Sequence, residues 1–174
     1  MDASVPKNVR RRVLEASVRA PRQWHQGAVE AAYSSDDEDW KLTAVFSMRW
    51  IRGFDKEILK ALESDNPDIH YEAVCAAGVW GVDAAWPHIA QLVASPDTEK
   101  NLLLAAIEAA AGIRPQEAEL ILEDLTLSND EEIVEAACDA MAMANGSLYS
   151  ESDEFDDFDD FDDFDEDDED GYVH

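Results

Sequence analysis

The residues best suited to chemistry lie near the C-terminus, where the unit Phe-Asp-Asp recurs with a period of three. Residues 151–174 contain 15 Asp and Glu and no Lys or Arg. A three-residue step would move each Phe by about 60° around a helix, so the rings would not form one stripe, and the crowded carboxylates would repel one another. Residues 149–174 are therefore predicted to form a disordered acidic tail. Its candidate partner-binding residues are Phe155, Phe158, Phe161 and Phe164.

Such a tail would act by binding, and its sequence is compatible with four functions. It can act as a solubilising segment. It can recognise a basic partner, because carboxylates attract cations and Phe rings dock in apolar pockets. It can also hold divalent cations weakly, although the Asp spacing of a formed calcium loop is missing. Finally, it can dock on cations of its own chain, which are Lys7, Arg10, Arg11 and Arg12.

Motifs for catalysis are missing from the chain. It has no Gly-x-Gly-x-x-Gly, no Walker loop, no Cys-x-x-Cys and no His-Glu-x-x-His, so phosphate-binding, zinc-finger and metalloprotease chemistry lack their residues. Cys75 and Cys138 are predicted to be buried, apolar thiols at equivalent core-facing positions, too far apart to bond each other. The sequence therefore predicts no catalytic residue, no cofactor and no metal ligand, and the protein is predicted not to be an enzyme.

The helices of the chain are predicted from a sequence repeat of about thirty residues that starts at Trp40. The second helix of each unit contains one equivalent Ala, and the offsets from Ala44 to Ala73, Ala105 and Ala136 are 29, 32 and 31. A polar turn precedes each of these helices and is predicted to cap it, because Ser, Asp and Asn accept hydrogen bonds from free amide groups. The turns are Ser35–Asp37, Ser64–Asp68, Ser95–Thr98 and Ser128–Asp130.

The first helix of each unit is apolar at three- and four-residue steps, as at Ile58 and Leu62. Such a stripe cannot be buried within one helix pair, so neighbouring pairs must stack. Residues 8–17 are interpreted as the second helix of a unit whose first helix is missing, and Pro21 separates them from the next helix. About eight or nine helices are predicted, all in one domain over residues 1–148.

Together, the Asp-rich turn, the helix from Asn66 to Gly78 and the opening of the next unit at 84–89 resemble the HEAT-repeat family, in the short bacterial and archaeal type called lyase-like HEAT repeats. The resemblance covers residues 8–145 and implies an all-α fold, a right-handed α-α superhelix. Second helices line the concave face in this family, which implies a candidate partner-binding patch there. The patch residues are Lys41, Arg49, Arg52, His70 and Trp80, with His70 interpreted as a solvated replacement for a basic residue.

Three enzyme groups share HEAT-like repeats. Deoxyhypusine hydroxylases hold iron with His-Glu pairs, but here His25, His70 and His88 are followed by Gln, Tyr and Ile. Alkylpurine glycosylases need a basic groove for DNA, whereas residues 61–150 hold 17 Asp and Glu against 2 Lys and Arg. Bilin lyases have little catalytic motif by which the sequence could exclude them, so a bilin-lyase-like enzyme stays a third interpretation.

The charge changes from a slightly basic end to an acidic one. Residues 1–60 hold 11 Lys and Arg against 9 Asp and Glu, and the whole chain has a formal net charge of -28. Fields of this kind set the sign of a partner and the encounter rate. The favoured interpretation is a non-enzymatic protein–protein interaction module or scaffold, whose acidic-aromatic tail engages a basic protein. The alternative is a nucleic-acid mimic or decoy that binds a DNA- or RNA-binding protein.

The remaining predictions concern the location of the protein, its binding to DNA and its oligomeric state. No apolar run approaches the roughly 18 residues of a membrane span and no secretory leader opens the chain, so a cytoplasmic protein without membrane contact is predicted. Direct binding to DNA is not expected. The chain is predicted to be a monomer or, if Val9, Val13 and Leu14 are exposed at the N-terminal end, a weak end-to-end dimer.

Overall fold

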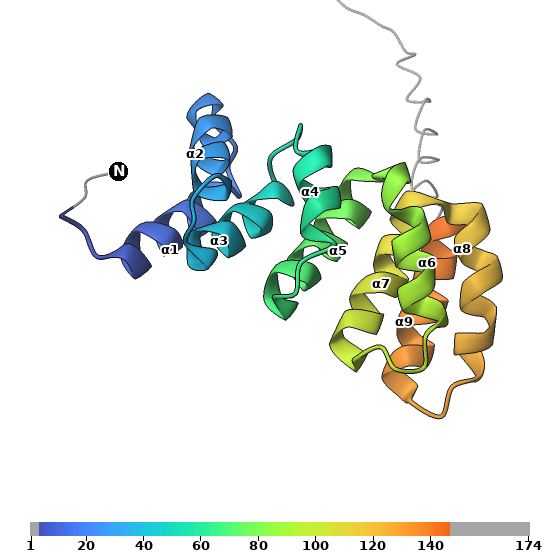
Figure 1. Ribbon diagram of the computed structural model, residues 1–174. Coiled ribbons are helices and arrows are strands. Elements are labelled where there is room, and N and C mark those ends of the chain that lie inside the picture. The colour runs from blue at the N-terminus through green and yellow to red at the C-terminus, as the bar shows by residue number, and fades with distance from the viewer. Residues whose placement is uncertain (1–3, 147–174) are drawn as a thin grey trace, which may run out of the picture.

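The computed structural model describes residues 4–146, and over that range the protein is all-helical, as predicted (Figure 1). No strand occurs among these residues, and the predicted tail at 149–174 lies outside them. The α-helices are α1 (Lys7–Ser17), α2 (Gln23–Tyr33), α3 (Glu38–Met48), α4 (Asp55–Ala61), α5 (Pro67–Trp80), α6 (Trp86–Ala94), α7 (Lys100–Ile113), α8 (Pro115–Leu122) and α9 (Glu131–Ala144). Two short 3-10 helices are η1 (Asp83–Ala85) and η2 (Glu123–Leu127).

The helices alternate between two rows. The odd-numbered helices form one row, in which α1 packs on α3, α3 on α5, α5 on α7 and α7 on α9. Each even-numbered helix packs against the odd-numbered helix that follows it, from α2 against α3 to α8 against α9 (Figure 1). The first described helix, α1, therefore lies in the row of the predicted second helices.

Polar turns start the odd-numbered helices from α3 onward. The side chains of Asp37, Asn66 and Asp130 accept backbone N–H groups from the first turns of α3, α5 and α9. Each of these caps is a residue of a predicted turn, which confirms those turns as helix starts. The turn before α7 differs, because the cap is Glu99, one residue beyond the predicted Ser95–Thr98. Its longer side chain accepts the N–H groups of Asn101 and Leu102.

One continuous apolar core extends along the described chain, from Leu14 on α1 to Ala140 on α9. Within this core α5 and α7 approach each other closely, where small residues face each other. A Cβ added to Gly78 would lie 2.6 Å from the Cα of Ala109, and one added to Gly112 would lie 2.5 Å from the carbonyl oxygen of Gly78. Both distances are far below a van der Waals contact, so the two backbones touch with no room for a side chain.

Two expectations about exposure change with the structure. Cys138 is exposed, so its prediction as a buried thiol was wrong, whereas Cys75 is half-buried. The reason is position, because α7 packs over α5 while no later described helix covers α9. At the other end, Val9 and Val13 are exposed on α1 but Leu14 is buried. None of the described helices is both long enough and apolar enough to cross a membrane.

Replacing Gly112 with Ala tests the close approach of α5 and α7. The added methyl group would clash with backbone atoms of Gly78, which cannot rotate away, so we expect Gly112→Ala to lower the free energy of unfolding by about 2–3 kcal/mol. The control is Gly27→Ala in α2, where an added Cβ meets nothing within 4 Å. That control should raise the free energy of unfolding by about 0.5–1 kcal/mol, because Ala favours a helix over Gly. Urea unfolding measures the free energy of unfolding of both variants. Equal values for the two would contradict the close approach of α5 and α7.

Candidate functional site

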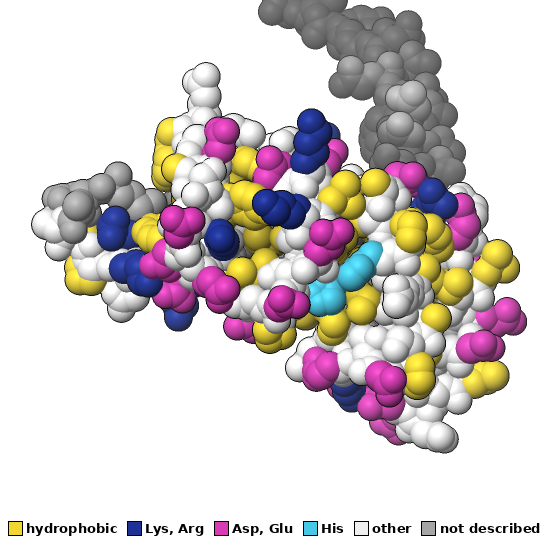
Figure 2. Space-filling view, viewed as in Figure 1, with side chains coloured by type: hydrophobic (Ala, Val, Ile, Leu, Met, Phe, Trp, Pro, Cys, Tyr) yellow, Lys and Arg dark blue, Asp and Glu magenta, His cyan; other side chains and the backbone are white. Residues whose placement is uncertain are grey.

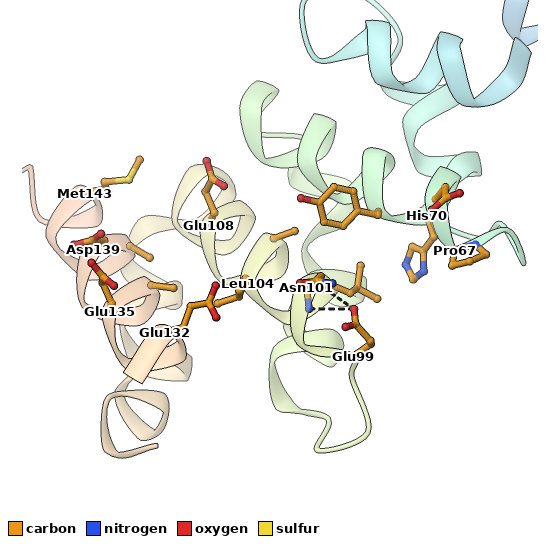
Figure 3. A pocket seen from close by; sticks show the side chains of 16 residues that line it. Pro67, His70, Glu99, Asn101, Leu104, Glu108, Glu132, Glu135, Asp139 and Met143 are labelled. Atoms are coloured by element: carbon orange, nitrogen blue, oxygen red, sulfur yellow. Dashed lines mark hydrogen bonds between the residues drawn. The ribbon is translucent and has the colours of Figure 1, made fainter. Parts of the chain in front are cut away.

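A groove with a volume of about 900 Å³ crosses the odd-numbered row over α5, α7 and α9 (Figure 3). Six carboxylates line it and no Lys or Arg does. These acids are Asp68, Glu99, Glu108, Glu132, Glu135 and Asp139. Apolar side chains separate them, and these are Leu102, Leu104, Ala105, Ala136, Ala140 and Met143. We refer to this surface as the acidic groove.

Helical periodicity gathers the acids on one surface. Glu132, Glu135 and Asp139 follow three- and four-residue steps, so they share one face of α9. Glu108 on α7 lies 31 residues before Asp139, which is the offset between the equivalent Ala residues of these two helices. Asp68 lies in the first turn of α5, where the positive end of the helix dipole favours a carboxylate. The same helix packing that buries the alanines therefore lines up the carboxylates.

Most of this charge is not neutralised within the described residues. The ammonium group of Lys100 pairs with Glu132 at 2.7 Å and with Asp130 at 2.8 Å, which offsets one groove acid. Asp68, Glu108 and Asp139 make no ion pair with any residue between 4 and 146, and neither does Glu135. Like charges that converge on a concave surface concentrate a negative potential there. The acidic groove is therefore suited to cations.

A histidine pair stands at the edge of the acidic groove. The Nε2 atoms of His70 on α5 and His88 on α6 lie 2.8 Å apart, so one imidazole donates its N–H and the other accepts (cyan in Figure 2). Burial lowers the pKa of His70 below 6.5, and the adjacent His88 lowers that pKa further. Burial also lowers the pKa of His88, while Glu63 opposes this change. The interpretation of His70 as a solvated, basic residue is thus corrected, because His70 is half-buried and hydrogen-bonded.

The predicted patch is not one cluster, because His70 and Trp80 lie near opposite ends of α5. The guanidinium of Arg52 lies 4.7 Å from the ring centroid of Trp80, and the indole N–H of Trp80 donates to the carbonyl of Met48 at 2.6 Å. His70 lies ten residues before Trp80, about 15 Å along the helix, and of the patch residues it alone lines the acidic groove. The indole is thus held by the core of its own chain.

The other patch residues lie on or next to α3. Arg49 follows its last turn and pairs with Glu72 of α5 at 3.4 Å, and burial raises the pKa of that carboxyl while Arg49 opposes the change. Lys41 is half-buried on α3 and makes no ion pair with a described residue. The four tail residues Phe155, Phe158, Phe161 and Phe164 lie outside the described residues.

Neither the groove acids nor His88 were among the residues predicted for the site. The signal for the acids was present, since Glu108 and Asp139 occupy one register position of the repeat in a strongly acidic stretch. Nothing in the sequence pairs His70 with His88, because they lie on different helices, 18 residues apart.

Metal chemistry has no formed site within residues 4–146, where no group of three or more His, Cys, Asp or Glu side chains is placed to hold an ion. No protein-family profile matches the sequence, and no curated protein matches it. The resemblance to HEAT repeats therefore depends on the repeat pattern of the sequence itself.

The histidine pair should make stability depend on pH. Both pKa values are lowered in the folded chain, so as the pH falls through about 6.5 the unfolded chain takes up protons that the folded pair resists. This contribution to stability is present above that pH and is lost below it. We expect the chain to lose more stability between about pH 7.5 and pH 5.5 than the variant His70→Gln/His88→Gln. Urea unfolding at both values measures the difference, and parallel losses would show that the pair is not the cause.

Proposed function

We propose that this chain is a non-enzymatic interaction module whose acidic groove binds a basic, amphipathic segment of another protein. The observation that carries the proposal is the groove lining, with six carboxylates, no Lys or Arg, and apolar side chains between the acids. The apolar surface would supply affinity by excluding water, and the carboxylates would orient a cationic partner and speed its approach.

The dimensions of the acidic groove favour a short peptide segment. Neighbouring packed helices lie about 8–10 Å apart, so α5 to α9 span roughly 20 Å, which is about six residues of extended chain. Cationic side chains on such a segment could reach acids on all three helices while apolar ones contact Leu104 and Met143. The acidic tail, tethered next to α9, would add a second contact at high effective concentration.

We propose a HEAT-like right-handed superhelix as the arrangement that presents this groove. Three observations support it: the register of about thirty residues, the two alternating rows of helices, and the capping turns repeated before α3, α5 and α9. A row of second helices would then form a continuous concave surface, and the acidic groove occupies its C-terminal half.

An amphipathic Lys/Leu peptide tests the acidic groove directly. Replacing Glu108 and Asp139 with Gln removes two unpaired groove charges, so we expect Glu108→Gln/Asp139→Gln to bind the peptide roughly tenfold more weakly. The matched control is Glu119→Gln/Glu123→Gln, which makes the same charge change at exposed positions outside the groove and should bind as the native chain does. Isothermal titration calorimetry of all three chains gives the dissociation constants.

A Lys/Ser peptide of equal charge separates the groove from a long-range field. Binding through the apolar lining requires the Leu residues and should persist partly at high salt. If both double variants weaken binding equally, and if the Leu residues make no difference, the groove proposal is wrong and the charge alone acts, as expected of a nucleic-acid mimic. Affinity capture with the native chain and the two variants then identifies the partner as the protein lost only with Glu108→Gln/Asp139→Gln.

A further inference from the structure

A smaller cavity of about 290 Å³ lies at the opposite end of the molecule, among α1, α2 and the start of α3. Its apolar lining comes from one residue of α1, three of α2 and one of α3. These are Leu14, Ala28, Ala31, Ala32 and Trp40. A closed apolar cavity of about 150 Å³ is enough to bind benzene, so this one has room for an aromatic ring.

Arg10 also lines this cavity, and no carboxylate of the described residues pairs with its charge. Its guanidinium lies 5.6 Å from the ring centroid of Trp40, and its Nε atom is buried without a hydrogen-bond partner. Arg10 forms no ion pair with a described residue, whereas its neighbours Lys7 and Arg11 both pair with Asp39. A buried N–H group without an acceptor is unfavourable and marks a place for an incoming one.

An apolar cavity beside an unpaired guanidinium suits a ligand in which an aromatic ring adjoins a carboxylate. The chain itself carries this combination four times, as the Phe-Asp pairs that begin at residues 155, 158, 161 and 164. We propose that this cavity binds a Phe-Asp pair of the chain's own C-terminal segment, with the ring against Leu14 and Trp40 and the carboxylate on Arg10. This site lies outside the acidic groove, and its test does not depend on peptide binding to that groove.

The number of residues between Gly146 and each Phe decides which Phe can reach the cavity beside α1. Four steps separate α9 from α1 along the odd-numbered row, about 32–40 Å at the usual spacing of packed helices. The nine residues from Gly146 to Phe155 span at most about 32 Å and the 12 to Phe158 at most about 43 Å, so neither leaves room for a path around the surface. The 15 residues to Phe161 and the 18 to Phe164 span up to about 54 and 65 Å, which leaves slack for such a path. Phe161 and Phe164 are therefore the expected occupants.

Fluorine NMR of the full chain with 4-fluorophenylalanine tests the docking. The chain has six Phe, so Phe46 and Phe54 report on the fold while the other four report on the C-terminal segment. We expect the resonance of Phe161 or Phe164 to lie away from its position in the denatured chain, because of the Trp40 ring. The shift should disappear in Arg10→Gln and at high salt, and it should persist in the control Arg12→Gln, a neighbouring charge outside this cavity.

A second comparison uses the Phe residues themselves. Phe161→Ala/Phe164→Ala should abolish the shifted signal, whereas Phe155→Ala/Phe158→Ala should leave it in place. The shift should not change on dilution, because docking within one chain does not depend on concentration. Four resonances at their denatured positions, or a shift that Arg10→Gln leaves intact, would overturn the proposal. A shift lost on dilution would also overturn it, in favour of docking between two copies.

Discussion

The contact between α5 and α7 at Gly78, Ala109 and Gly112 sets the geometry on which the rest of the structure depends. Two backbones touch there because neither glycine carries a side chain. This contact fixes how closely the middle pair of the odd-numbered row can pack, and α3 and α9 pack on the outer sides of that pair. The acidic groove crosses both helices, so the separation of Asp68 on α5 from the acids on α7 depends on this contact.

Much of this architecture could be predicted from the sequence because it depends on local chemistry. Ser64, Asn66 and Pro67 together mark a helix start, and α5 begins at Pro67 with Asn66 as its cap. The cap at Glu99 could not be predicted in the same way, since Glu is not among the preferred capping residues.

The candidate site could be predicted only in part, because it depends on contacts between helices distant in sequence. The repeat register places Glu108 and Asp139 at one position, so their alignment is readable from the spacing. By contrast, Cys75 is half-buried and Cys138 is exposed although the two residues share a register position, because α5 packs between two odd-numbered helices and α9 packs on only one of those described. Likewise, the lowered pKa of His70 depends on burial and on the adjacent His88, which no local pattern indicates.

The helix caps have a further consequence for the acidity of the chain. Contacts between Lys7 and Asp37 and between Lys100 and Asp130 join the first turns of neighbouring odd-numbered helices, so these helices run parallel with their N-termini at one edge. Parallel helix dipoles side by side repel each other, and the carboxylates at the N-termini of α3, α5, α7 and α9 offset the accumulated positive partial charge. Part of the negative charge of this protein therefore balances its own stacked backbone dipoles, and only the remainder is free to act on other molecules.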